Sequence, residues 1–188
     1  MKDARPALAV TLALLACGSS SAGGTAQGSA AGSATGTVRG VALGVQDAFF
    51  SNEVATGTVL GVTSFPGACE ALYTNMHYPH GSAGLSIQLI AYPSGGGTAG
   101  PVTAPGTFTL LGSTIGGNSF GAAWTSVDAS CNPTSVQATG GTIDLTEVTA
   151  SQLKGTFDLT FGADHLTGSF TASDCAAAAG AQGNPTCS

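Results

Sequence analysis

The sequence predicts an all-β protein, and three observations carry this prediction. Apolar and polar side chains alternate along many short segments, as they do in strands with one buried face. Turn-forming pairs such as Pro66-Gly67 and Pro105-Gly106 separate these segments. Only one segment has helical spacing. We therefore expect a single antiparallel sandwich or barrel of about eight strands with one short helix, and the pattern leaves sandwich and barrel open.

The expected strands carry apolar residues at alternate positions, and they run over 37–45, 57–65, 85–91, 107–111, 120–124, 143–146, 153–161 and 166–172. Short turns join the last three, which indicates a three-strand meander. The expected helix covers 68–75, where Leu72 and Tyr73 follow Cys69 by three and four residues. The all-β domain is thus expected over 36–175, with a C-terminal tail over 176–188.

The N-terminus has the features of an export signal. Lys2 and Arg5 precede an apolar run over 7–16, which as a helix would be about 15 Å long. A bilayer core is roughly 30 Å thick, so this run cannot span it. We therefore expect a signal peptide over 1–16. Residues 18–35 contain no charge and no large apolar side chain, which predicts a flexible linker.

The segment Leu14-Leu15-Ala16-Cys17 resembles the lipobox of bacterial lipoproteins. The resemblance implies cleavage before Cys17, lipidation of Cys17 and a membrane anchor made of acyl chains such as palmitate. Gly18 follows the cysteine where an inner-membrane retention signal has aspartate, so the family rule points to the outer membrane. The alternatives are a plain secretory signal cleaved near Cys17 and an N-terminal core helix.

The expected β-domain carries a second resemblance. Its segments Gly36-Thr-Val-Arg-Gly40, Pro105-Gly-Thr-Phe108 and Gly141-Thr-Ile-Asp-Leu-Thr146 look like uncharacterised lipoproteins of high-GC soil bacteria. The segments Gly155-Thr-Phe-Asp-Leu159 and Leu166-Thr-Gly-Ser-Phe170 extend it over most of 36–175. These pieces are strand and turn residues, and the resemblance implies no activity.

The net negative charge and the small number of basic residues limit the classes of partner that the chain can bind. Loss of Lys2, Arg5 and Asp3 with the signal peptide leaves two of the four basic residues and nine of the ten acidic ones, a net charge of −7. A nucleic-acid site needs a cluster of basic side chains, so we expect no nucleic-acid partner. The same count excludes electrostatic attachment to anionic lipid. The expected membrane contact is through the N-terminal lipid alone, and a protein or small-molecule partner stays open.

Four cysteines remain besides Cys17, and an even number in an exported chain indicates two disulfides. Four cysteines allow three pairings, of which we prefer Cys69–Cys131 with Cys175–Cys187. The second bridge would tie down the tail. No Cys-x-x-Cys spacing occurs, so we expect neither a zinc site nor thioredoxin-type chemistry.

Three short motifs resemble catalytic or ligand-binding patterns. Residues 117–121, Gly-Asn-Ser-Phe-Gly, match a nucleophile elbow, but strand-like residues follow where the motif needs a helix. Residues 95–100 match a dinucleotide fingerprint by letter, but Pro101 follows at once. His77 and His80 are metal candidates only by spacing, without a nearby carboxylate. We expect a polar loop there, and neither a metal nor a cofactor.

These observations predict a lipid-anchored, non-enzymatic protein of the cell envelope, whose β-domain serves binding or surface structure. The alternative is a barrel that holds a small apolar molecule inside it. A hydrolase is the third hypothesis. An interior filled with side chains would favour the first prediction, and a large cavity the second. A pocket that brings Ser119 near His77, His80 or His165 would favour the third.

Overall fold

The computed structural model describes residues 32–54, 57–92, 98–112, 117–179 and 186–187. The expected signal peptide and Cys17 lie outside these residues. So do residues 18–31 of the expected linker and residues 95–97 of the 95–100 motif. None of the described helices is long and apolar enough to cross a membrane.

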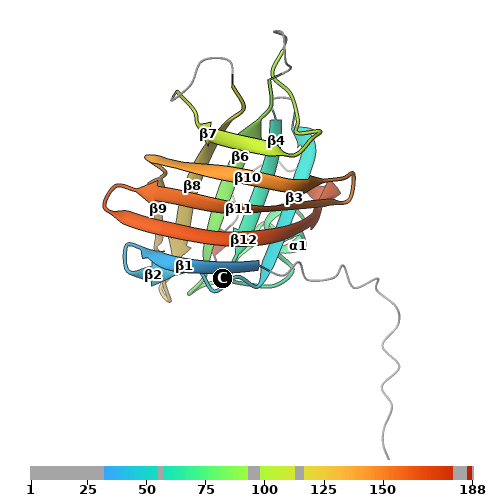
Figure 1. The fold of residues 1–188 in the computed structure, drawn as a ribbon. Coiled ribbons are helices and arrows are strands. Elements are labelled where there is room, and N and C mark those ends of the chain that lie inside the picture. The colour runs from blue at the N-terminus through green and yellow to red at the C-terminus, as the bar shows by residue number, and fades with distance from the viewer. Residues whose placement is uncertain (1–31, 55–56, 93–97, 113–116, 180–185, 188) are drawn as a thin grey trace, which may run out of the picture.

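Eight strands form a closed barrel (Figure 1). This confirms the all-β prediction and shows that, of the two expected architectures, the chain adopts the barrel and not the sandwich. Around the barrel the order is β3 (Asp47–Val54), β4 (Gly57–Thr63), β6 (Ala83–Ile90), β8 (Ser119–Val127), β7 (Gly106–Leu110), β10 (Gly140–Val148), β11 (Gln152–Phe161) and β12 (Asp164–Asp174). Strand β12 pairs with both β11 and β3, and this second pairing closes the ring.

The barrel is flattened into two layers. In Figure 1, β7, β10, β11 and β12 cross steeply in front of β3, β4, β6 and β8, and we call these the front and back sheets. Short parallel pairings join the layers, Thr109 with Ser119 and Ser173 with Phe49. The other described pairings between barrel strands are antiparallel. Three further strands extend the sheets: β1 (Gly32–Val38), β2 (Val41–Ala42) and β9 (Pro133–Gln137).

Large side chains fill the interior between the two sheets. Trp124, Phe50, Phe108 and Phe120 are completely buried in one continuous apolar cluster, together with leucines and isoleucines from both sheets. Residues at alternate positions on each strand point into this cluster, as the alternating pattern predicts. The barrel therefore has a packed core.

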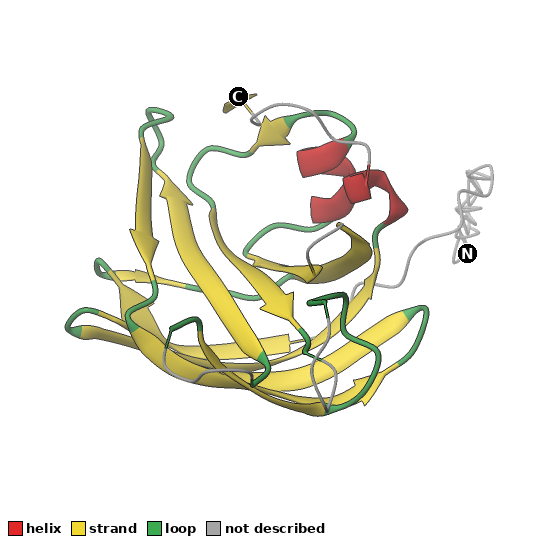
Figure 2. Cartoon of the chain, turned by 90° about the horizontal axis from the view of Figure 1, so that it is seen from above, coloured by secondary structure: helices red, strands yellow, loops and turns green. Residues whose placement is uncertain are grey.

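A second, smaller apolar cluster lies outside the barrel. Helix α1 (Ala68–Tyr73), strand β5 (His77–Tyr78), 3₁₀ helix η1 (Ala176–Ala179) and strand β13 (Thr186–Cys187) form a cap, with the helices against one side of the barrel (Figure 2). Phe49 of β3 packs in this outer cluster, whereas its neighbour Phe50 packs in the interior. Strand β3 is thus covered on both faces, and the cap covers part of the outer face of the back sheet.

Two disulfides hold the cap, and the expected pairing is wrong. The bonds join Cys69 to Cys175 and Cys131 to Cys187. Closure of the barrel brings the end of β12 beside β3, and this places Cys175 under the helix that carries Cys69. The tail is tied down as expected, but to the loop after β8. The short separation between Cys175 and Cys187 did not determine the pairing, because tertiary packing brings distant segments together.

Several element boundaries differ from the prediction. Strand β1 begins at Gly32, so residues 32–35, expected in the linker, pair with β12. Small residues suit this strand, since a Cβ at Gly36 would collide with the carbonyl oxygen of His165. The expected strand 37–45 is interrupted by a turn at Arg39-Gly40, where both residues have positive φ. Strands β3 and β9 were not predicted, and the helix is shorter than 68–75, since it ends at Tyr73.

Candidate functional site

A groove of about 520 Å³ lies between the cap and the outer face of the back sheet. Strands β3, β4, β6 and β8 contribute its floor, and α1, β5, β13 and the segment from Cys131 to Pro133 contribute its walls. Each of the described residues that line it is uncharged. It lies outside the packed interior, so the space open to a ligand is on the barrel's surface.

The floor of the groove is made of small residues placed opposite one another on neighbouring strands. Gly61 of β4 pairs with Ser86 of β6, and Gly84 of β6 pairs with Thr125 of β8. These positions point away from the interior, which Leu60, Leu85 and Trp124 occupy from the adjacent positions on the same strands. The lack of bulk on the floor leaves room for side chains of the cap above it.

Aromatic side chains fill part of that room and form the walls. The rings of Phe49 and Tyr73 meet edge to face with centroids 5.5 Å apart, and Phe65 and Tyr78 do so at 5.4 Å. A Cβ at Gly84 would lie 2.5 Å from the hydroxyl oxygen of Tyr78. The hydroxyl group of Tyr78 therefore lies directly over the floor of the groove.

The polar groups of the groove are hydroxyls. Burial raises the pKa of Tyr78 to about 12, and burial also raises the pKa of Tyr73. Both phenols are therefore neutral at physiological pH. The Thr63 hydroxyl donates to the carbonyl oxygen of Phe65 at 2.8 Å, whereas Ser86 is exposed. An occupant would meet neutral hydrogen-bonding groups on an otherwise apolar surface.

Covalent and backbone links fix the cap over the sheet. The Cys131–Cys187 disulfide forms part of the groove wall, and β13 pairs in parallel with β5. The amide of Thr186 donates to the carbonyl oxygen of Met76 at 2.8 Å, which holds β13 against the segment before β5. The amide of Gly81 donates to the carbonyl oxygen of Asp128 at 3.2 Å. The groove is thus a preformed feature of the fold.

The structure does not assemble the residues of the nucleophile motif into a hydrolase site. Ser119 opens strand β8 and is buried, and its Oγ atom has no hydrogen-bond partner. His165 is exposed on the front sheet and lies 2.7 Å from Asp158. Asp164, its neighbour in sequence, accepts a hydrogen bond from the amide of Arg39 at 3.0 Å. A nucleophile elbow requires a strand-to-helix turn, and here the serine continues into a strand.

The two metal candidates lie in and after β5, with His77 half-buried in the strand and His80 exposed in the loop. Within the described part of the chain, no three His, Cys, Asp or Glu side chains gather into a possible metal site. Cys17, the expected lipidation site, lies outside the described residues. The groove was not foreseen from the sequence, because its residues come from between positions 49 and 187 and form no local motif.

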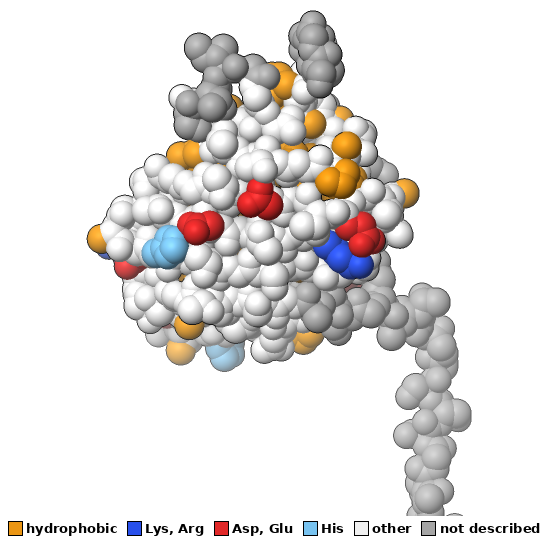
Figure 3. All heavy atoms as spheres, viewed as in Figure 1, with side chains coloured by type: hydrophobic (Ala, Val, Ile, Leu, Met, Phe, Trp, Pro, Cys, Tyr) orange, Lys and Arg blue, Asp and Glu red, His pale blue; other side chains and the backbone are white. Residues whose placement is uncertain are grey.

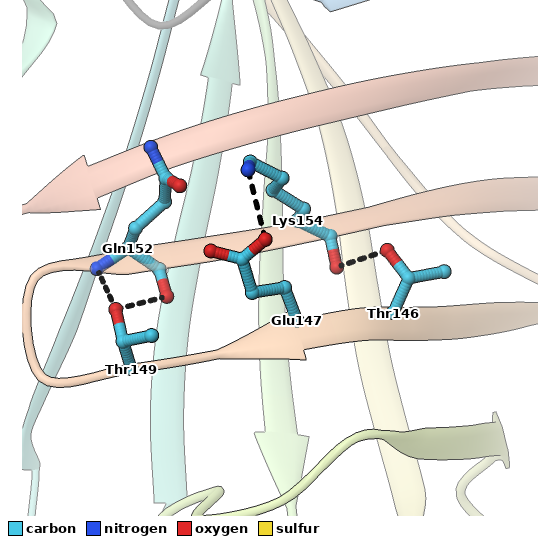
Figure 4. Close-up of polar contacts among 5 residues, drawn as sticks. All are labelled: Thr146, Glu147, Thr149, Gln152 and Lys154. Atoms are coloured by element: carbon cyan, nitrogen blue, oxygen red, sulfur yellow. Dashed lines mark hydrogen bonds and ion pairs between the residues drawn. The ribbon is translucent and has the colours of Figure 1, made fainter.

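The front sheet presents a different surface, on which uncharged groups predominate and charged side chains are few and scattered (Figure 3). Lys154 Nζ lies 2.8 Å from Glu147 Oε2 on neighbouring strands (Figure 4). Thr146 donates to the carbonyl oxygen of Lys154 at 3.3 Å, and the turn is closed by hydrogen bonds between Thr149 and Gln152. One of the two basic residues expected in the mature chain is therefore engaged on the front sheet.

Comparisons with protein-family models, curated proteins and solved structures each found no match. The fold and the site define a β-barrel with a packed core and a disulfide-held groove on its outer face.

Proposed function

We propose that this chain is a lipid-anchored binding protein of the cell envelope, in which the barrel is a rigid scaffold and the outer groove is the binding site. The single observation that carries the proposal is the location of the open space. A preformed groove lies on the outside of the barrel, while Trp124 and six phenylalanines help to fill the inside. Its volume is within the range of about 300–1,000 Å³ typical of small-molecule sites.

The packed interior argues against the alternative in which a ligand lies inside the barrel. A ligand there would have to displace completely buried side chains such as Phe50, Phe108 and Trp124. Removing large core side chains costs about 3–5 kcal/mol each, and displacing them would be of similar cost. The outer groove needs no such rearrangement.

A non-enzymatic role is supported by the positions of the candidate catalytic groups. Ser119 is buried with its hydroxyl unpaired, and His165 is bound to Asp158 on the front sheet. The groove itself offers tyrosine, serine and threonine hydroxyls, and its two cysteines are joined in a disulfide. Such a set binds and orients a ligand but supplies no general base near neutral pH.

The proposed location follows from two features. Two disulfides indicate an oxidising compartment outside the cytoplasm. The lipobox resemblance at Cys17 supports a lipid anchor, and Gly18 after it supports the outer membrane under the family rule. Strand β1, whose first residue is Gly32, follows Cys17 by fifteen positions, so the barrel is joined to the anchor at the edge of the front sheet.

Substitution of Cys17 tests the anchor. The Cys17→Ala chain should lose its acyl label in palmitate-fed cells and leave the membrane fraction, or accumulate as uncleaved precursor. Cys131→Ala is the control for replacement of a cysteine elsewhere in the chain; it removes the Cys131–Cys187 disulfide but should keep the label and the anchor. If Cys17→Ala is processed normally and stays on membranes in high salt, the lipid anchor is wrong.

Substitution of Ser86 tests the groove. Ser86 is exposed on the groove floor, so a phenylalanine there fills the space without disturbing the interior. Titration of the full chain in detergent with 2-naphthol, a small aromatic probe, should show saturable binding that Ser86→Phe abolishes. Thr156→Phe, at an exposed position of β11, is the matched control and should bind as the wild type does. Equal binding by all three proteins would show that the probe partitions elsewhere.

A further inference from the structure

The composition of the groove limits the chemistry of its ligand. We propose that it takes an uncharged molecule with a flat apolar ring and one hydroxyl or carbonyl group. This inference rests on the proposed function of the groove as a binding site, and adds the class of ligand.

Anionic ligands are excluded by the absence of a cation to pair with them. The described strands and helices that line the groove contain no lysine and no arginine. Of the two basic residues outside the expected signal peptide, Lys154 is paired with Glu147 on the front sheet and Arg39 lies in the turn between β1 and β2. Glu70 on α1 and Asp128 after β8 add negative charge around the groove. An anion would lose its hydration and meet repulsion in place of a partner.

Cationic ligands would be attracted from outside by the same negative charge, but they would find no carboxylate among the described residues of the groove to form an ion pair with. Asp47 accepts the Ala68 amide at 2.8 Å, at the start of α1. Asp128 accepts the amides of Ser130 and Asn132, each at 2.8 Å. None of the described acidic side chains lines the groove. A buried cation would therefore pay its desolvation cost without a salt bridge.

The walls and floor favour a flat molecule with one polar group. Phe49, Leu72 and Tyr73 line the groove with aromatic and aliphatic side chains. Phe49 and Tyr78 cover the two glycine positions of the floor, so the surface that meets a ligand is made of side chains. Flat rings stack against such surfaces in offset or edge-to-face arrangements. The hydroxyls of Tyr78 and Ser86 stand at the floor and can donate to, or accept from, a hydroxyl or carbonyl oxygen of the ligand.

Three probes with one ring system and different charge test this inference. Calorimetric titration of the full chain in one detergent would compare 2-naphthol, naphthalene-2-sulfonate and 2-naphthyltrimethylammonium at pH 7. We expect 2-naphthol to bind at least about tenfold more tightly than either ion, a difference that a single unpaired charge easily produces. The preference should disappear in Ser86→Phe and persist in Thr156→Phe.

The outcomes distinguish the proposal that the groove is a binding site from the proposal that its ligand is uncharged. Binding of the sulfonate or the ammonium with an affinity equal to that of 2-naphthol, and blocked by Ser86→Phe, would overturn the uncharged class while keeping the groove as a binding site. Absence of any Ser86-dependent binding by all three probes would overturn both. Should Ser86→Phe fold poorly by circular dichroism, Thr125→Phe blocks the groove from the neighbouring strand and serves as the second variant.

Discussion

The outer end of the Phe49 ring lies directly over Gly61, its partner on the neighbouring strand, so that a Cβ at position 61 would overlap three atoms of the ring. Phe49 in turn packs on Tyr73 of the cap. This contact joins the back sheet to the cap, and it requires a residue without a side chain at position 61. Glycine at position 61 of β4 thus allows Phe49 of β3 to pack in the outer cluster.

Gly61→Ala is therefore expected to destabilise the protein by about 1–3 kcal/mol, because the added methyl group must displace the Phe49 ring from a packed cluster. Gly121→Ala is the matched control, since it lies in the same sheet and a Cβ there meets no atom within 4 Å. The control should be neutral or slightly stabilising, by up to about 1 kcal/mol. Urea unfolding of both variants measures the difference. A Gly61→Ala protein as stable as Gly121→Ala would contradict the packing described here.

The disulfide pairing has a direct test by proteolysis. Trypsin can cut at Lys154, which separates Cys69 and Cys131 from Cys175 and Cys187. Because both bonds cross that site, the denatured, unreduced digest should keep fragments 40–154 and 155–188 joined. Reduction should release them. Recovery of the two fragments separately without reduction would instead support pairing Cys69 with Cys131.

A second measurement distinguishes the observed pairing from the other one in which both bonds cross Lys154, Cys69–Cys187 with Cys131–Cys175. Further cleavage at aromatic residues between Cys69 and Cys131, followed by backbone fragmentation between Cys175 and Cys187 in the mass spectrometer, assigns each partner. Loss of either bond should destabilise the fold by at most about 4–5 kcal/mol from loop entropy, given separations of 106 and 56 residues.

The sequence predicts β11 and β12, which have one buried face, and misses β3, whose two faces are both covered. Strands β11 and β12 alternate cleanly because one face meets the core and the other meets solvent. Strand β3 shows no alternation, because Phe50 packs inside the barrel while Phe49 packs under the cap. Its burial on both faces comes from tertiary contacts with α1 and η1, which no local pattern records.

The groove and the disulfide pairing depend on the same long-range contacts. In the sequence, Gly61, Gly84 and Ser86 are simply residues of low strand propensity. Only the cap above them explains why small side chains are needed there. The cap reaches its place because β12 ends beside β3 and carries Cys175 there. Packing of segments about a hundred residues apart therefore decides the site, whereas the class of fold follows from local periodicity.

Tyr78 should make the stability of the protein depend on alkaline pH. Burial raises its pKa to about 12, above the value of about 10 expected in the unfolded chain. The unfolded state therefore releases its proton first, so the contribution of Tyr78 is intact below pH 10 and is lost as the pH rises from 10 to 12. The slope is at most about 1.4 kcal/mol per pH unit.

Tyr78→Phe should flatten this decline, because phenylalanine does not titrate. Urea midpoints measured from pH 8 to pH 12 compare the two proteins, with Tyr92→Phe as a control at a tyrosine outside the groove. Parallel curves for the wild type and Tyr78→Phe would mean that the Tyr78 phenol is not protected by burial.

Ser119 offers the clearest test of whether the Gly-Asn-Ser-Phe-Gly motif is chemical or structural. Its hydroxyl is buried without a hydrogen-bond partner, which costs stability, so Ser119→Ala should be neutral or stabilising by up to about 2 kcal/mol. Thr58→Val is the contrasting variant. Thr58 is also buried, but its hydroxyl donates to Asn52 and accepts the amide of Val102 at 2.9 Å. Removing it should cost about 1–3 kcal/mol by leaving that amide unpaired. If Ser119→Ala destabilises the fold as much as Thr58→Val does, or removes a measurable esterase activity, the hydroxyl has a partner or a role that its unpaired position does not explain.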